Sequence, residues 1–109
     1  MKLKIDTTKR EEVKVELEDP RNGKTQRLIQ KQKLGSQVLL PMIVKILKKN
    51  ELNLKDLTAV EVNCGPGSFT GTRVGVSVAN ALGFALDIPV NGKKGKIVVP
   101  IYEKSKFDK

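Results

Sequence analysis

Apolar residues recur at every second position in two stretches near the start of the chain, at Leu3 and Ile5 and then at Val13, Val15 and Leu17. A period of two predicts two half-buried strands. The sequence DPRNG at 19–23 predicts a turn, because Asn-Gly tolerates positive φ. Residues 24–33 follow as a third strand, and their polar character favours the edge of a sheet. Three strands with short connections predict an antiparallel meander.

The pattern becomes helical over residues 35–52, and Ser36 is the expected N-cap. Pro41 either kinks the first turns of this helix or marks its true start. The last turns carry cations that suit the negative end of the helix dipole, at Lys45, Lys48 and Lys49. Apolar residues fill about two thirds of the helical circle, roughly twice the stripe that one packing contact needs. We therefore expect the helix to bury one flank on its own sheet and the other on something else.

The second half of the chain predicts a short capped turn at 53–57, a strand at 58–63 and a helix at 72–86. Small residues recur at every fourth position along this helix, at Gly71, Gly75, Ala79 and Gly83. Such a stripe allows another backbone to approach closely. Residues 97–104 predict a last strand. The resulting order, β-β-β-α-β-α-β, predicts an α/β fold with a mixed five-stranded sheet and helices packed on it.

The sequence CGPGSFTG at 64–71 could form a phosphate-binding loop, a nucleophile site or the entry to a packed helix. It lacks the Walker spacing, and Thr70 stands where a dinucleotide-binding loop needs its third glycine. An anion at the helix N-terminus, on amides near Ser68 and Thr70, stays an alternative. The favoured interpretation is structural, with a turn, a helix cap, an aromatic in the core and a small residue opening the stripe. Its residues are Gly65, Pro66, Gly67, Ser68, Phe69, Thr70 and Gly71.

Composition excludes several chemistries. The chain has no histidine, which removes Ser-His-Asp and Cys-His catalysis and the commonest metal ligand. Cys64 is the only cysteine, and a buried, inert thiol is favoured over a nucleophile. We expect no metal and no cofactor. A length of 109 residues favours one domain, and the sequence shows neither a membrane-spanning apolar run nor a signal-peptide core. We therefore expect a cytoplasmic protein that does not bind membranes.

Charge is unevenly distributed along the chain. The formal net charge of +9 is concentrated in residues 1–50 and 91–109. A solvated lysine-rich surface explains this excess, and weak attraction to RNA is the alternative. The chain contains three phenylalanines and one tyrosine, and none of them follows a base-stacking pattern.

Residues 65–90, GPGSFTGTRVGVSVANALGFALDIPV, resemble the signature segment of the TsaB (YeaZ) family. IDTT at 5–8, LLPMI at 39–43 and the L-x-L-x-D-L pattern at 52–57 match in the same order, so the resemblance covers residues 1–92. It implies a ribonuclease H-like lobe of the actin/Hsp70/sugar-kinase superfamily. We expect residues 1–109 to form a single such lobe, with residues 93–109 as a basic C-terminal segment.

The resemblance also implies a function. TsaB relatives are non-catalytic scaffolds that pair with a TsaD-like catalytic subunit and act with the ATPase TsaE. Together they place threonylcarbamoyl on adenosine 37 of tRNA. We expect this chain to pair through its two helices, to form a homodimer when alone, and to contact tRNA only indirectly or weakly. The expected interface comprises Val38, Leu39, Met42, Ile43, Ile46, Arg73, Ser77 and Asn80.

Two departures from the family pattern argue against nucleotide turnover. Family members usually continue into a second lobe of similar size. Catalytic members of the superfamily carry a glycine soon after the first aspartate, whereas Asp6 is followed by Thr7, Thr8, Lys9 and Arg10. Two alternatives to the scaffold stay open. One is a nucleotide-binding or protease-like enzyme of the same superfamily, and the other is a homodimeric interaction module with weak RNA affinity.

Overall fold

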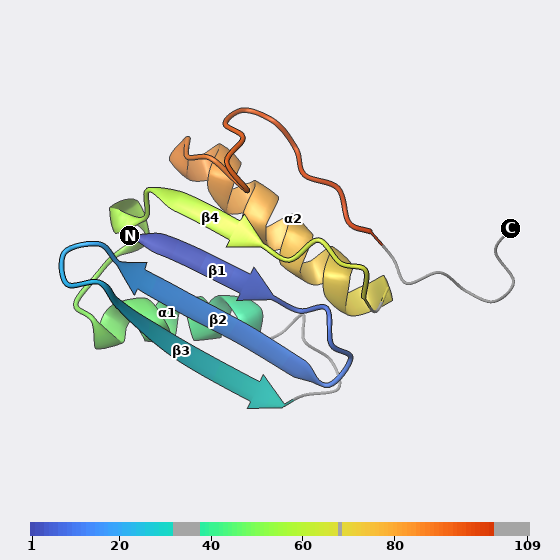
Figure 1. Ribbon diagram of the computed structural model, residues 1–109, viewed down its shortest axis with the longest axis horizontal. Helices are drawn as coiled ribbons and strands as arrows, with labels where there is room; N and C mark the ends of the chain where they lie inside the picture. Colours follow the sequence, from blue (N-terminus) through green and yellow to red (C-terminus); the bar gives the residue numbers. More distant parts are fainter. Residues whose placement is uncertain (32–37, 68, 102–109) are drawn as a thin grey trace, which may run out of the picture.

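The computed structural model describes residues 1–31, 38–67 and 69–101 (Figure 1). Within them lie four strands, two α-helices and one turn of 3-10 helix. The elements are β1 (Lys2–Asp6), β2 (Glu12–Asp19), β3 (Lys24–Lys31), α1 (Leu39–Lys49), η2 (Leu54–Asp56), β4 (Ala59–Val62) and α2 (Phe69–Leu86). No helix in this part of the chain is long and apolar enough to cross a membrane.

The strands form one mixed sheet in the order β3-β2-β1-β4. β1, β2 and β3 are the predicted antiparallel meander, and β4 pairs with β1 in parallel after the crossover through α1. The period of two predicted for β1 and β2 is confirmed, because alternate side chains of both strands are buried. β3 is exposed along most of its length, as its polar sequence predicts for an edge strand.

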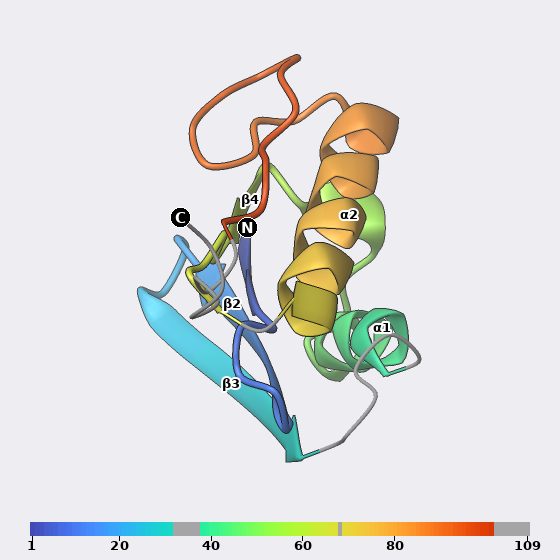
Figure 2. The same ribbon diagram turned by 90° about the vertical axis from the view of Figure 1, so that its right-hand side faces the viewer.

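Both helices cover the same face of the sheet (Figure 2). α1 packs on β2 and β3, whereas α2 packs on β4 and β1. Between the helices and the sheet lies one hydrophobic core, whose fully buried side chains include Leu3, Ile5, Val15, Leu39, Ile43, Ile46 and Val60. The opposite face of the sheet carries charged side chains. This two-layer arrangement, with four strands in the described residues, fits a single ribonuclease H-like lobe.

The small-residue stripe of α2 faces the sheet. A Cβ added at Gly75 would overlap the hydroxyl of Thr7, and one added at Gly83 would overlap a methyl group of Val90. Ala79 between them is completely buried. The close packing predicted from this spacing is therefore confirmed, and its neighbours are side chains of the chain's own sheet and of the segment that follows the helix.

The sequence predicts five strands, whereas the described residues contain four, so this prediction is wrong. The outer edge of β4 is closed by the segment that follows α2. Val60 donates its backbone N–H to Pro89 and accepts a bond from the Asn91 N–H, while the Asn91 side chain bonds both the N–H and the carbonyl of Val62. A fifth strand would need those same backbone groups. The described part of the predicted last strand, residues 97–101, accordingly forms no ladder.

The helix boundaries also differ from the predictions. Ser36, the expected cap of the first helix, lies outside the described residues, and Val38 occupies the N-cap position of α1. Pro41 is the third residue of α1, where a backbone N–H would have no acceptor within the helix. α2 begins at Phe69, three residues before the predicted start.

Candidate functional site

Two loops meet where the parallel strands β1 and β4 end. Asp6 ends β1, and its carboxylate accepts hydrogen bonds from the backbone N–H and the hydroxyl of Thr8 at 3.0 and 2.7 Å. The other carboxylate oxygen accepts a bond of 3.2 Å from the amide of Asn63, which follows β4. Asp6 thus ties the loop after β1 to the start of the signature loop.

These hydrogen bonds determine the protonation of Asp6. Partial burial on its own would raise the pKa of this carboxyl group. The bonds from Thr8 and Asn63, together with the nearby Lys14 ammonium, outweigh burial and lower the pKa below its ordinary value of 3.8. Asp6 is therefore ionised at neutral pH and engaged as a structural acceptor. The Asp-Thr-Thr sequence at the end of a strand is a signal for this turn that our sequence predictions missed.

The signature loop is packed tightly against its surroundings. Gly65 has a φ of 105°, which favours glycine, and the Gly65-Pro66 peptide bond is cis. A Cβ added at Gly67 would lie 2.5 Å from the Cβ of Thr8 and 2.8 Å from its carbonyl oxygen. The hydroxyl of the buried Thr7 donates to the carbonyl of Gly71. These contacts favour the structural interpretation of the loop. Ser68 and the side chains of Phe69 and Thr70 lie outside the described part, so the predicted cap and core plug stay predictions.

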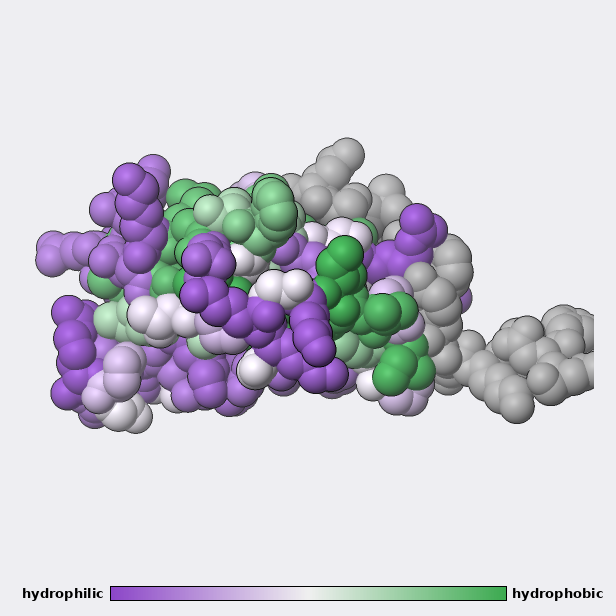
Figure 3. Space-filling model, turned by 90° about the horizontal axis from the view of Figure 1, so that it is seen from above, coloured by the Kyte–Doolittle hydropathy of each residue, from purple (hydrophilic) through white to green (hydrophobic). Residues whose placement is uncertain are grey.

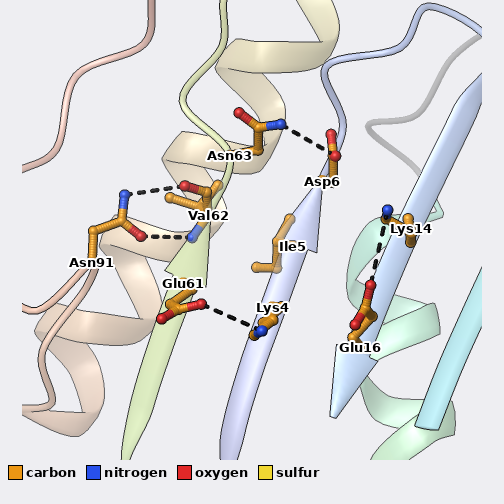
Figure 4. Close-up of a pocket in the computed structure, with 9 residues that line it drawn as sticks. All are labelled: Lys4, Ile5, Asp6, Lys14, Glu16, Glu61, Val62, Asn63 and Asn91. Carbon is orange, nitrogen blue, oxygen red and sulfur yellow. Dashed lines mark hydrogen bonds and ion pairs between the residues drawn. The ribbon is translucent and has the colours of Figure 1, made fainter. Parts of the chain in front are cut away.

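A depression of about 450 Å³ opens beside Asp6 on the face of the sheet away from the helices (Figure 4). Its charged side chains neutralise one another, because Lys4 lies 3.8 Å from Glu61 and Lys14 lies 3.9 Å from Glu16. Such pairing leaves little uncompensated positive charge to attract a phosphate. No group of three or more His, Cys, Asp or Glu side chains within the described ranges could hold a metal ion.

Half of the predicted interface lies inside the chain's own core. Leu39, Met42, Ile43 and Ile46 are between 0% and 5% exposed, packed between α1 and the sheet. As contact residues for a partner these four predictions are wrong, because the wide apolar arc of α1 turns this side toward β2 and β3. Val38 is half-buried beside the same core.

The exposed side of the arc carries different residues. Leu40 is 50% and Val44 40% exposed, one helical turn apart. Together with other side chains of α1 they line a shallow groove, here called the α1 groove, formed by Leu40, Pro41, Val44, Lys45, Lys48 and Lys49. The width of the arc indicated a second contact surface, but the period alone could not assign residues to each side.

On α2, Arg73 and Ser77 are exposed as a contact surface requires. Asn80 instead pairs with the chain itself, because its side-chain amide bonds the N–H and the carbonyl of Val98 at 3.0 and 2.9 Å. The Ile101 N–H bonds the Cys64 carbonyl, so residues 98–101 are held against α2 and the signature loop. Hydrophobic side chains remain exposed on this side (Figure 3), at Phe84, Ile97, Val99 and Ile101.

Comparison with known proteins gives this geometry a context. Residues 30–92, more than half of the chain, match the family model described as TsaD, tRNA N6-adenosine threonylcarbamoyltransferase. The "tRNA threonylcarbamoyladenosine biosynthesis protein TsaB" of Haemophilus influenzae is 44% identical over 59 residues, which are 54% of this chain and 25% of that protein. The chain belongs to the family that this model describes, and within it to the TsaB (YeaZ) group. The matched part thus spans about a quarter of that TsaB protein.

Solved structures agree with this assignment. YeaZ from Pseudomonas aeruginosa superposes with a TM-score of 0.76 and 34% identity, over 82% of this chain and 42% of that one. A second structure, of a protein described as similar to the peptidase YeaZ from the same organism, matches with a TM-score of 0.76, 33% identity, and 82% and 40% coverage. The resemblance to TsaB and the ribonuclease H-like lobe predicted from sequence are therefore confirmed.

Proposed function

We propose that the chain is a non-catalytic scaffold subunit in the biosynthesis of tRNA threonylcarbamoyladenosine, pairing in the cytoplasm with a TsaD-like catalytic subunit. Two matches carry this proposal: residues 30–92, which include both helices and the signature loop, match the family model described as TsaD, and 59 residues are 44% identical to a TsaB protein. Two features support a scaffold. Asp6 is engaged in holding two loops together, and the helical layer presents exposed apolar side chains on α1.

Reconstitution with the partner tests the proposal. The chain and the TsaD-like subunit of the same host are purified separately, with a TsaE-like ATPase added in a further arm, and transfer of threonylcarbamoyl from an activated donor to a tRNA transcript is measured. Neither subunit alone should modify adenosine 37, whereas the mixture should. Modification by the TsaD-like subunit without this chain, or failure of the two to co-elute, contradicts the proposal.

Self-association in the absence of the partner is part of the same proposal. Exposed apolar side chains on α1 favour a homodimer that covers them. Light scattering at high micromolar concentration should report twice the mass of 12.0 kDa. A monomer under those conditions contradicts this part, while the pairing with a TsaD-like subunit is tested independently.

A hydrolytic enzyme is the second candidate, because one structural neighbour is described as similar to a peptidase. The complete absence of histidine removes the usual base for a serine or cysteine nucleophile. We expect neither peptide cleavage nor ATP turnover above about 0.01 per second, far below common enzyme rates. Faster ATP turnover that disappears in Asp6→Ala would favour the enzyme.

A further inference from the structure

The chain contains two asparagines that are followed by glycine, Asn22 and Asn91. In this context an asparagine can lose its side-chain amide without an enzyme, because the nitrogen of a glycine has no adjacent Cβ to hinder its attack. Both Asn-Gly pairs lie in exposed turns. Sequence and exposure therefore do not distinguish the two sites, and the hydrogen bonds of each side chain have to decide which one reacts.

The side chain of Asn91 is fixed on β4 (Figure 4). Its Oδ1 accepts a hydrogen bond of 2.8 Å from the Val62 N–H, and its Nδ2 donates to the Val62 carbonyl at 3.0 Å. Nδ2 also donates to the Cys64 Sγ at 3.4 Å. To meet the Gly92 nitrogen, the side chain would have to leave β4 and give up these bonds, which leaves two backbone groups of Val62 without partners.

The side chain of Asn22 is held much less firmly, in the turn that joins β2 and β3 at one end of the sheet (Figure 1). Its Nδ2 has no hydrogen-bond partner within the described residues. Its Oδ1 accepts a bond of 2.9 Å from the Lys24 N–H. When Cγ of Asn22 is attacked, negative charge develops on Oδ1, and this N–H donor stabilises that charge.

The nucleophile at this site is the backbone nitrogen of Gly23. A Cβ added at Gly23 would meet nothing within 4 Å, so no neighbouring group crowds the position. The Gly23 N–H donates to the Asp19 carbonyl at 2.9 Å, and this bond must open before the nitrogen reacts. Gly23 lies in an exposed turn, where water replaces the lost partner.

We infer that Asn22 is the site at which the folded chain deamidates spontaneously, whereas the hydrogen bonds to β4 protect Asn91. The Gly23 nitrogen loses its proton to solvent and forms a bond to Cγ of Asn22. The bond from Cγ to Nδ2 breaks, and Nδ2 takes a proton from water and leaves as ammonia. Water then opens the cyclic imide at either carbonyl, which gives aspartate or isoaspartate. Isoaspartate routes the main chain through the side-chain carbons, so it lengthens the turn and adds a negative charge.

Site-resolved peptide mass spectrometry of the full chain tests the inference. The folded wild type is incubated at neutral and at mildly alkaline pH, and replacement of the amide by a carboxyl group is followed at both asparagines. Asn22 should convert about tenfold faster than Asn91, which corresponds to about 1.4 kcal/mol, the order of the net free energy of the bonds that Asn91 must break. The rate at Asn22 should rise with pH, because the reaction needs the deprotonated nitrogen. In concentrated urea, where neither side chain is held, the two rates should become similar.

Gly23→Ala and Gly92→Ala form a matched pair of variants. Both glycines have a positive φ, 68° and 79°, and at both an added Cβ would meet nothing within 4 Å. Gly23→Ala should abolish most of the deamidation of the folded chain, whereas Gly92→Ala should leave it unchanged. Circular dichroism checks that both variants fold, and if either does not, the rate ratio in the wild type decides alone. Conversion of Asn91 as fast as that of Asn22 in the folded wild type overturns the inference, and so does an unchanged rate at Asn22 in folded Gly23→Ala.

Discussion

Gly67→Ala tests whether the signature loop is a packed structural element. The new Cβ would lie 2.5 Å from the Cβ, 2.8 Å from the carbonyl oxygen and 2.9 Å from the Cα of Thr8. Two of these atoms belong to the backbone, and Thr8 is tied to Asp6 by two hydrogen bonds. Thr8 therefore cannot rotate a side chain away, and either the loop or the turn after β1 must move.

The size of the effect follows from this crowding. Overpacking of this kind costs about 1–3 kcal/mol, and an unyielding backbone favours the upper half of that range. Replacing glycine by alanine also reduces the conformational entropy of the unfolded chain, which offsets about 0.5–1 kcal/mol of this destabilisation. A net loss of about 2 kcal/mol lowers the melting temperature of a domain of this size by about 10 °C.

Thermal unfolding followed by circular dichroism measures this shift. Gly95→Ala is the comparison, because its Cβ would meet nothing within 4 Å although its φ of 74° carries strain. Gly95→Ala should therefore lower the melting temperature by less than Gly67→Ala does. An unchanged or raised melting temperature for Gly67→Ala would refute the packing argument and reopen the interpretation of the loop as a ligand-binding element.

Three further outcomes follow from burial and hydrogen bonding. Met42→Glu should unfold the chain rather than separate a dimer, because it places a carboxylate in the core at 5% exposure; a folded monomer by circular dichroism and light scattering would contradict this. Because folding lowers the pKa of Asp6, its ionised carboxylate stabilises the fold at pH values above the unfolded-state pKa of about 3.9. This stabilisation is lost as the pH falls through the lower folded-state pKa. Asp6→Asn should therefore flatten the acid limb of urea-unfolding stability, and an unaltered slope would argue against the bonds from Thr8. Asn91→Ala should cost about 1–3 kcal/mol in urea unfolding, because Val62 loses partners for its N–H and carbonyl, and a cost near zero would show that β4 needs no such closure.

Most of the fold could be predicted because its signals are local. The alternation in β1 and β2, the turn at Asn22-Gly23 and the four-residue stripe of α2 each depend on residues close in sequence. The fifth strand could not be judged in this way. Residues 97–101 have the composition of a strand, but a strand also needs unpaired backbone groups on the neighbouring strand. At the outer edge of β4 the Asn91 side chain already bonds the N–H and the carbonyl of Val62.

The predicted site likewise combines features that the local sequence determines with features that only tertiary packing determines. The glycines of the signature loop could be recognised from their spacing, and the structure shows that Gly67 packs on the turn after β1. The sequence predicts contact residues on the side of α1 that faces the sheet, because an apolar arc of two thirds of a circle does not show which side is exposed. Only the position of β2 and β3 determines that Ile43 is buried and Val44 half exposed.

The closure of β4 also explains why Ile97, Val99 and Ile101 keep their side chains exposed. A fifth strand in the sheet would turn alternate side chains toward the helices and bury them. Asn91 occupies the edge, and the hydrogen bonds that residues 97–101 form within the described part of the chain go to Asn80 and Cys64. Ile97 and Val99 remain 80% and 69% exposed. The lobe thus presents two separate apolar surfaces, one here and one in the α1 groove. Lysines border both surfaces, Lys45, Lys48 and Lys49 at the α1 groove and Lys93 and Lys96 beside Ile97, so salt should weaken the attraction of an acidic partner to either one.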